Sequence, residues 1–175
     1  MTTTTRLTGS IAAATLAATL AVTGTAGAKA GERTFQQTYP FASRLCAHVQ
    51  AGRGPIHLRP FSAQVLADCA TLNSGFTAAQ SAVLGAQTSF ASGLAAHKAA
   101  IAAACTPPVK HPSLCRRTRR SQHAAIVALR REHRAAVRLY YTTIEANRRA
   151  FWAAIRSLPG GRGIPVDRPI PRQDS

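Results

Sequence analysis

Two long stretches of this chain place apolar residues at every third or fourth position, one over about 60–104 and the other over about 113–158. This spacing aligns the apolar side chains along one stripe of an α-helix. Alternating steps of three and four residues are typical of helices that pack against one another along their length, as in a coiled coil. The pattern therefore predicts two long helices, each roughly 65 Å long.

A shorter helix is predicted over about 40–51. Pro40 suits the first turn of a helix, Leu45 and Val49 lie four residues apart, and Gly52 ends the pattern. Three helices and no strand pattern predict an all-α fold. We expect an elongated antiparallel hairpin of the two long helices, with the short third helix packed against it as a small helical bundle.

The cysteines set a register for this hairpin. If Cys105 faces Cys115 across the turn, residue numbers that lie opposite one another add to about 220. The rule brings apolar residues together in the pairs Val65–Ile155, Phe76–Ile144, Val83–Val137 and Leu94–Ile126. Because the register follows from the cysteines alone, these apolar matches support it independently.

Four cysteines permit three disulfide pairings. Besides the bridge of Cys105 to Cys115, we expect Cys46 to pair with Cys69, because Cys69 lies on the apolar stripe of the long helix. This second bridge would hold the short helix against the hairpin. Free thiols or a metal site are the weaker alternative, since no C-x-x-C pair is present.

The first 30 residues are typical of a secretory signal peptide. A short segment with one charge, Arg6, precedes an uncharged apolar run over 7–22 and a small-residue stretch with two Ala-x-Ala steps. The apolar run is shorter than the ~20 residues that span a bilayer, and an uncleaved anchor is the alternative. Cleavage would follow Ala28 or Ala30. We expect a secreted protein, or one of the periplasm or cell envelope, where disulfides form.

The remainder would form one helical domain over 31–160. Residues 161–175 contain three prolines and are basic, so we expect them to be a disordered tail.

Charge is the most pronounced feature of the composition. The chain has 22 Lys and Arg against 6 Asp and Glu, a formal net charge of +16. A field of this sign favours association with polyanions. The competing interpretation is compositional: arginines on solvated helix faces also keep a protein soluble.

The arginines gather on the last helix, whereas the stretch 61–104 carries one Asp and one Lys. We take as the candidate polyanion-binding residues Arg116, Arg117, Arg119, Arg120, Arg130, Arg131, Arg134 and Arg138. The expected partner is an anionic polymer or a membrane surface. Sequence-specific nucleic-acid binding is not expected, because few aromatic residues are left for base stacking.

Two other functions stay open. The neutral long helix is rich in small side chains, so it could mediate self-association into a homo-oligomer or pairing with a partner helix. In the register above, His97 falls opposite His123, and two imidazoles could bind a metal, although zinc sites use three or four protein ligands.

Catalysis is not expected. Between residues 31 and 160 no two carboxylates lie three or four positions apart, and no phosphate-binding loop or nucleophile motif is present. The sequence thus predicts a protein without enzymatic activity and without a cofactor.

Overall fold

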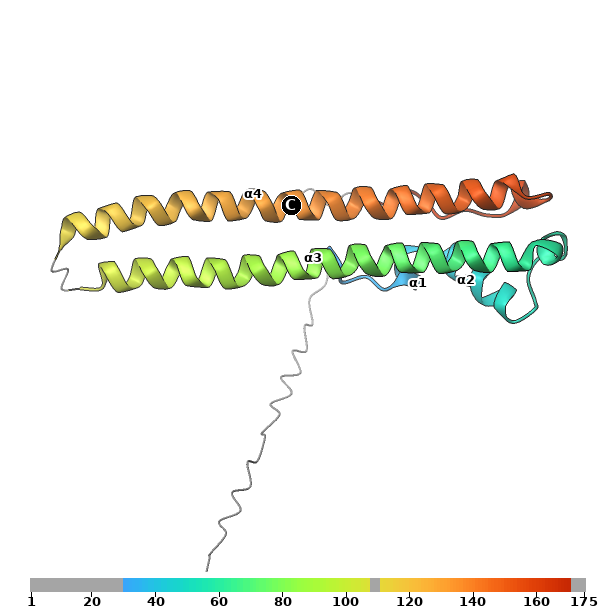
Figure 1. The fold of residues 1–175 in the computed structure, drawn as a ribbon, viewed down its shortest axis with the longest axis horizontal. Helices are drawn as coiled ribbons and strands as arrows, with labels where there is room; N and C mark the ends of the chain where they lie inside the picture. The colour runs from blue at the N-terminus through green and yellow to red at the C-terminus, as the bar shows by residue number, and fades with distance from the viewer. Residues whose placement is uncertain (1–29, 108–110, 171–175) are drawn as a thin grey trace, which may run out of the picture.

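The computed structural model describes residues 30–107 and 111–170 (Figure 1). Over these residues the protein is all-α, without strands, as predicted. The helices are α1 (Phe35–Thr38), α2 (Pro40–Gln50), η1 (Ile56–Phe61), α3 (Ser62–Cys105), α4 (Pro112–Ser157) and η2 (Gly161–Gly163), where η denotes a 3-10 helix.

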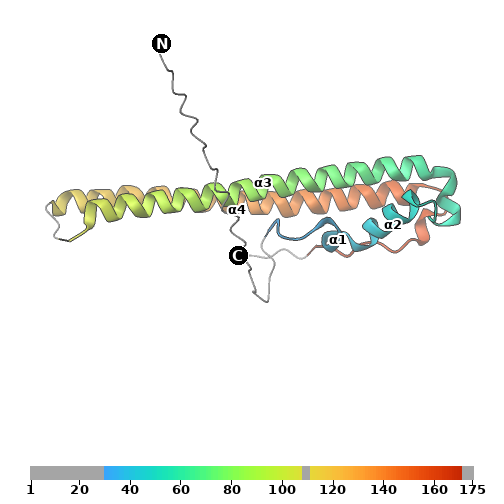
Figure 2. The ribbon, with the colours of Figure 1, turned by 90° about the horizontal axis from the view of Figure 1, so that it is seen from below.

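The long helices α3 and α4 lie side by side and antiparallel over their whole length (Figures 1 and 2). Their bounds differ by one or two residues from the stretches predicted by the apolar pattern. Helix α2 likewise matches the predicted short helix. The predicted hairpin with a short third helix is therefore confirmed.

Helix α1 and the 3-10 helix η1 were not predicted. Helix α1 depends on a reciprocal cap: the Thr34 hydroxyl accepts a hydrogen bond from the Gln37 backbone N–H, and the Gln37 side chain accepts one from the Thr34 backbone N–H. Such a box stabilises the start of even a one-turn helix, whose apolar content is too small to show a periodicity.

The core fills only one half of the hairpin. Helices α1 and α2 pack along the half that lies away from the turn (Figure 2). The largest fully buried side chains in this half are those of Tyr39, Leu58, Ile144, Ile155, Val65, Val83 and Asp167. In the remainder, residues 84–105 and 112–139, Cys115 alone among the described residues is buried. We call this remainder the distal half; among the described residues, no third helix packs over its two helices (Figure 2).

Both predicted disulfides are present. Cys46 bonds to Cys69 with a Cα–Cα distance of 5.9 Å, and Cys105 bonds to Cys115 with one of 5.1 Å. The bridges therefore fix α2 to α3 at one end of the hairpin and close the turn at the other.

Contacts between α3 and α4 follow the predicted register. Phe90 stacks on His133, with ring centroids 4.7 Å apart. A Cβ atom on Gly75 would lie 2.6 Å from Asn147 Nδ2, so the missing side chain of Gly75 makes room for Asn147. Helix α3 continues without a break at Gly75. Because this residue has no side chain, the two helices can approach one another closely there.

The predicted disordered tail is wrong for residues 161–170. Asp167 is 1% exposed and accepts hydrogen bonds from the backbone N–H groups of Phe41 (2.7 Å) and Ala42 (3.2 Å) and from Trp152 Nε1 (3.2 Å). These residues form a strap along α4, and the apolar side chains that pack it against the core are Ile164, Val166 and Ile170. The prolines suggested disorder. The buried Asp167 carboxylate instead fixes this segment against the start of α2, where it provides the cap that the Tyr39 side chain does not provide. Residues 171–175 lie outside the described residues.

The predicted signal peptide, 1–30, lies outside the described residues except for Ala30. The Ala30 carbonyl accepts a hydrogen bond from Gln87 Nε2 (2.7 Å), and the Gly31 carbonyl accepts one from Gln80 Nε2 (2.7 Å). Within the described part of the chain, no helix is both long enough and apolar enough to cross a membrane.

Candidate anion-binding surface

All eight candidate arginines project from α4 in the distal half, and all are exposed. Successive residues of an α-helix are about 100° apart around its axis. This places the eight within about half of the circumference of α4, to one side of the seam with α3. On the other side of this seam, α4 carries Ala125, Leu129 and Ala136. We call the eight residues the distal arginine face.

None of the eight forms an ion pair among the described residues. The carboxylate nearest to them in sequence, Glu132, is exposed and also forms none there. Arginines four residues apart, such as Arg130, Arg134 and Arg138, repel one another by a few tenths of a kcal/mol per pair. The distal arginine face therefore carries positive charge that no ion pair among the described residues neutralises.

Two arginines toward the other end of α4, Arg148 and Arg149, are paired with a carboxylate, whereas Arg156 is exposed and forms no ion pair among the described residues. Arg148 forms a two-point contact with Glu145, Nε to Oε2 at 2.8 Å and Nη2 to Oε1 at 2.7 Å, and it donates to the Asp167 carbonyl. Arg149 donates to the same Glu145. Hydrogen bonds from Arg148 lower the pKa of Glu145 from 4.5 to about 2. Arg148 thus connects α4 to the segment around Asp167, and the arginines of the distal arginine face make no such contact among the described residues.

Near the turn, a shallow hollow of about 300 Å³ opens on the same surface. Its lining residues are Ser113, Arg116, Arg117 and Arg120. Guanidinium groups donate paired hydrogen bonds to phosphate, sulfate and carboxylate oxygens. Several of them around one hollow can thus contact one anionic group of a polymer.

Three of the four aromatic side chains on α4 are not available to a ligand of this surface. Tyr140, Phe151 and Trp152 are each less than 5% exposed. The Tyr39 hydroxyl donates to the Ile144 carbonyl (2.7 Å), and burial raises the pKa of Tyr39 above its ordinary value. These rings belong to the core, and Tyr141 is the one aromatic residue of α4 that is partly exposed, so the helix offers a single ring and no stacking platform for nucleotide bases.

The two histidines considered for a metal site, His97 and His123, differ in their exposure to solvent. His97 is partly buried, and its Nδ1 lies 2.5 Å from Gln122 Oε1, whereas His123 is exposed. In residues 30–107 and 111–170, no group of three or more His, Cys, Asp or Glu side chains comes together. The described geometry therefore gives a two-histidine metal site no support.

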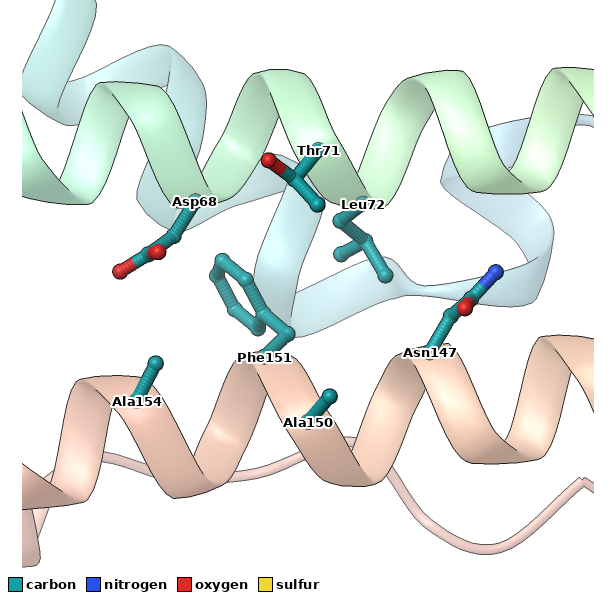
Figure 3. A pocket seen from close by; sticks show the side chains of 7 residues that line it. All are labelled: Asp68, Thr71, Leu72, Asn147, Ala150, Phe151 and Ala154. Atoms are coloured by element: carbon teal, nitrogen blue, oxygen red, sulfur yellow. The ribbon is translucent and has the colours of Figure 1, made fainter.

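A second feature was not found from the sequence. A hollow lies between α3 and α4 in the half that contains the core (Figure 3), lined by Asp68, Thr71, Leu72, Asn147, Ala150, Phe151 and Ala154. The signal was present, since Asp68 is the single acidic residue in 61–104 and Asn147 is polar on an apolar stripe. Either position alone suggested no site.

Comparisons of the chain with protein-family models, with curated proteins and with solved structures found no match. The evidence for a function is therefore the chemistry of these two surfaces.

Proposed function

We propose that this is a non-enzymatic exported protein that binds an anionic polymer, or the anionic surface of a cell envelope, through the distal arginine face. The observation that carries the proposal is the contrast between two groups of arginines on one helix. Arg148 and Arg149, beside the core, are paired with Glu145, and the eight in the distal half are exposed and form no ion pair among the described residues.

The dimensions of the face favour a linear polymer over a small anion. From Arg116 to Arg138 there are 22 helical steps, which correspond to about 33 Å. Arginines one turn apart are about 6 Å from one another, within the Debye length of about 10 Å at 0.1 M salt. A charged polymer lying along α4 would contact several guanidinium groups at once and would relieve their mutual repulsion.

Export is supported by the disulfides and by the leader-like N-terminus. The two bridges are compatible with an extracellular or otherwise oxidising compartment. In such a compartment, the partners that carry dense negative charge include acidic polysaccharides of the envelope or the extracellular space and the surfaces of anionic lipids.

The alternative function is assembly through helix packing. Its support is that no third helix of the described residues covers the distal half, where the side chains of Phe90, Leu94 and Ile126 remain partly exposed. Apolar side chains between two helices gain further burial when a third helix covers them. Two copies would, however, bring two strongly positive chains together.

Retention of the oxidised protein on heparin, with elution by a salt gradient, tests the proposal. The test variant carries Arg130→Ala, Arg134→Ala and Arg138→Ala. A matched control replaces three exposed arginines near the other end of the hairpin, Arg53, Arg156 and Arg162, so that both variants lose the same charge.

We expect the distal variant to elute at clearly lower salt than the parent, and the control to elute close to the parent. Equal retention of the two variants would show that net charge alone drives binding, and it would refute the distal arginine face as the site. Early elution of the parent, together with a dimeric mass by light scattering in high salt, would favour assembly instead.

A further inference from the structure

The hollow between α3 and α4 differs from the arginine face in place and in chemistry. It has a volume of about 120 Å³ and is bounded by residues of the two long helices (Figure 3). Ala150 and Trp152 are two residues apart, so they lie on nearly opposite faces of α4. Trp152 faces the Asp167 strap, and the hollow therefore opens on the face of the hairpin away from the strap.

Two polar atoms at the hollow are buried without a hydrogen-bond partner among the described residues. They are Asp68 Oδ2 and Asn147 Nδ2. Such groups are uncommon in folded proteins, because leaving a buried donor or acceptor unpaired forfeits its interaction with water. Burial also raises the pKa of Asp68. The lining includes no Lys, Arg or His that could pair with the carboxylate.

Apart from Thr71, whose hydroxyl donates to the Ala67 carbonyl (3.0 Å), the remainder of the hollow is apolar. Leu72 is 3% exposed and Phe151 is 4% exposed, so these two side chains form a buried floor. Ala150 and Ala154 have small side chains and leave space above it. Asp68 and Asn147 stand at opposite ends of this floor (Figure 3).

We propose that this hollow binds a small amphipathic organic cation, a primary ammonium or guanidinium group that carries a short apolar chain. The charged head donates hydrogen bonds to Asp68, and the chain lies on Leu72 and Phe151 toward Asn147. Hydrophobic pockets with a few placed polar groups are the common form of small-molecule sites.

The features of the hollow select this class of ligand. A carboxylate oxygen accepts hydrogen bonds, so the head group must donate them, and an anionic ligand would be repelled. One carboxylate is too few to hold a metal ion. An apolar cavity of about 150 Å³ in another protein takes up benzene, so the volume here suits a molecule of about five or six heavy atoms. A lysine side chain of another polypeptide presents the same chemistry.

The test is titration of the ¹⁵N-labelled, oxidised protein with butylammonium, followed by amide chemical shifts. Butanol and butyrate have the same number of carbon atoms as butylammonium with a neutral and an anionic head, and they serve as ligand controls. The variants are Asp68→Asn, which keeps the shape of the side chain, and Ala150→Leu, which fills the hollow. Ala146→Leu, at an exposed position of α4 outside the lining, is the control variant.

We expect saturable shifts at residues lining the hollow, with a dissociation constant of about a millimolar or tighter for so small a ligand. Asp68→Asn and Ala150→Leu should each weaken binding by about tenfold or more, and Ala146→Leu should leave it unchanged. Butanol and butyrate should give no saturable shifts there.

The absence of saturable shifts with butylammonium, equal binding of butanol, or full binding by either lining variant would overturn the proposal. N-acetyl-lysine methylamide distinguishes the two sources of the cation. Binding of this capped lysine as well as butylammonium indicates a lysine of a partner chain, and binding of butylammonium alone indicates a free amine. The result is independent of the arginine face, since none of its residues lines the hollow.

Discussion

Replacement of Asp167 by alanine should destabilise the protein more than its position near the C-terminus suggests. The carboxylate accepts three hydrogen bonds, from the first-turn N–H groups of Phe41 and Ala42 in α2 and from the indole of Trp152. Loss of a helix cap costs about 1 kcal/mol, and each buried donor left unpaired costs about 1–3 kcal/mol.

The partly buried Phe41 N–H regains a hydrogen bond to water after the substitution, so the losses do not add in full. We expect the free energy of unfolding to fall by about 3–5 kcal/mol, out of a total of about 5–15 kcal/mol for a domain of this kind. At about 3 °C per kcal/mol, the melting temperature should fall by about 10 °C. Asp167→Asn retains one acceptor oxygen and should lose about half as much.

Urea unfolding followed by circular dichroism measures this difference, with the disulfides intact. Arg168→Ala is the control, because Arg168 is adjacent and exposed. Amide hydrogen exchange should also quicken at Phe41 and Ala42 in the Asp167 variants alone. A loss below about 1 kcal/mol for Asp167→Ala would refute the role of this carboxylate as the cap of α2, since that is less than the cost of one unpaired buried donor.

Two further perturbations test the packing of α4. Glu145 has a folded-state pKa of about 2 against an ordinary value of 4.5, so the stability that its ionised form contributes should be present above pH 4.5 and lost as the pH falls toward 2. The variant Glu145→Gln cannot form an ion pair with Arg148, so its acid unfolding should lack this pH-dependent loss. An acid-unfolding profile identical to that of the parent would contradict a stabilising role of the ionised Glu145. Gly75→Ala should destabilise by about 1–3 kcal/mol because its Cβ would meet Asn147, whereas Gly85→Ala, where nothing lies within 4 Å, should stabilise α3 by about 0.5–1 kcal/mol. Thermal melts of the two variants should shift in opposite directions, and shifts of the same sign would contradict the close approach at Gly75.

Much of the fold could be predicted because the two longest elements carry an unbroken apolar stripe. A stripe of this length fixes which face of each helix is buried, and Cys105 and Cys115 fix the register in which the stripes meet. The pairing of Cys46 with Cys69 followed from the same geometry.

The strap could not be predicted by such reasoning. Asp167 contacts Phe41 across 126 residues of sequence, and no local pattern records a contact of that range. The hollow was missed for a similar reason, since Asp68 and Asn147 become a pair only when α3 and α4 are placed together.

For the arginine face, the sequence predicted which residues gather on one helix, and it could not tell which arginines are already paired. Arg148 and the distal arginines look alike in sequence, and they differ in the structure because Arg148 makes a partly buried contact with Glu145.

The most direct test of the proposed function is the salt dependence of affinity for a labelled heparin fragment. Binding through several guanidinium groups releases counterions, so the logarithm of the association constant should fall linearly with the logarithm of salt concentration. Each arginine that contacts the polymer contributes about one unit of slope. We expect a steep slope for the parent, a slope smaller by about two to three units for the variant lacking Arg130, Arg134 and Arg138, and the parent slope for the control lacking Arg53, Arg156 and Arg162. The same slope for both variants, or a parent affinity that does not depend on salt, would contradict the distal arginine face as a polyanion-binding site.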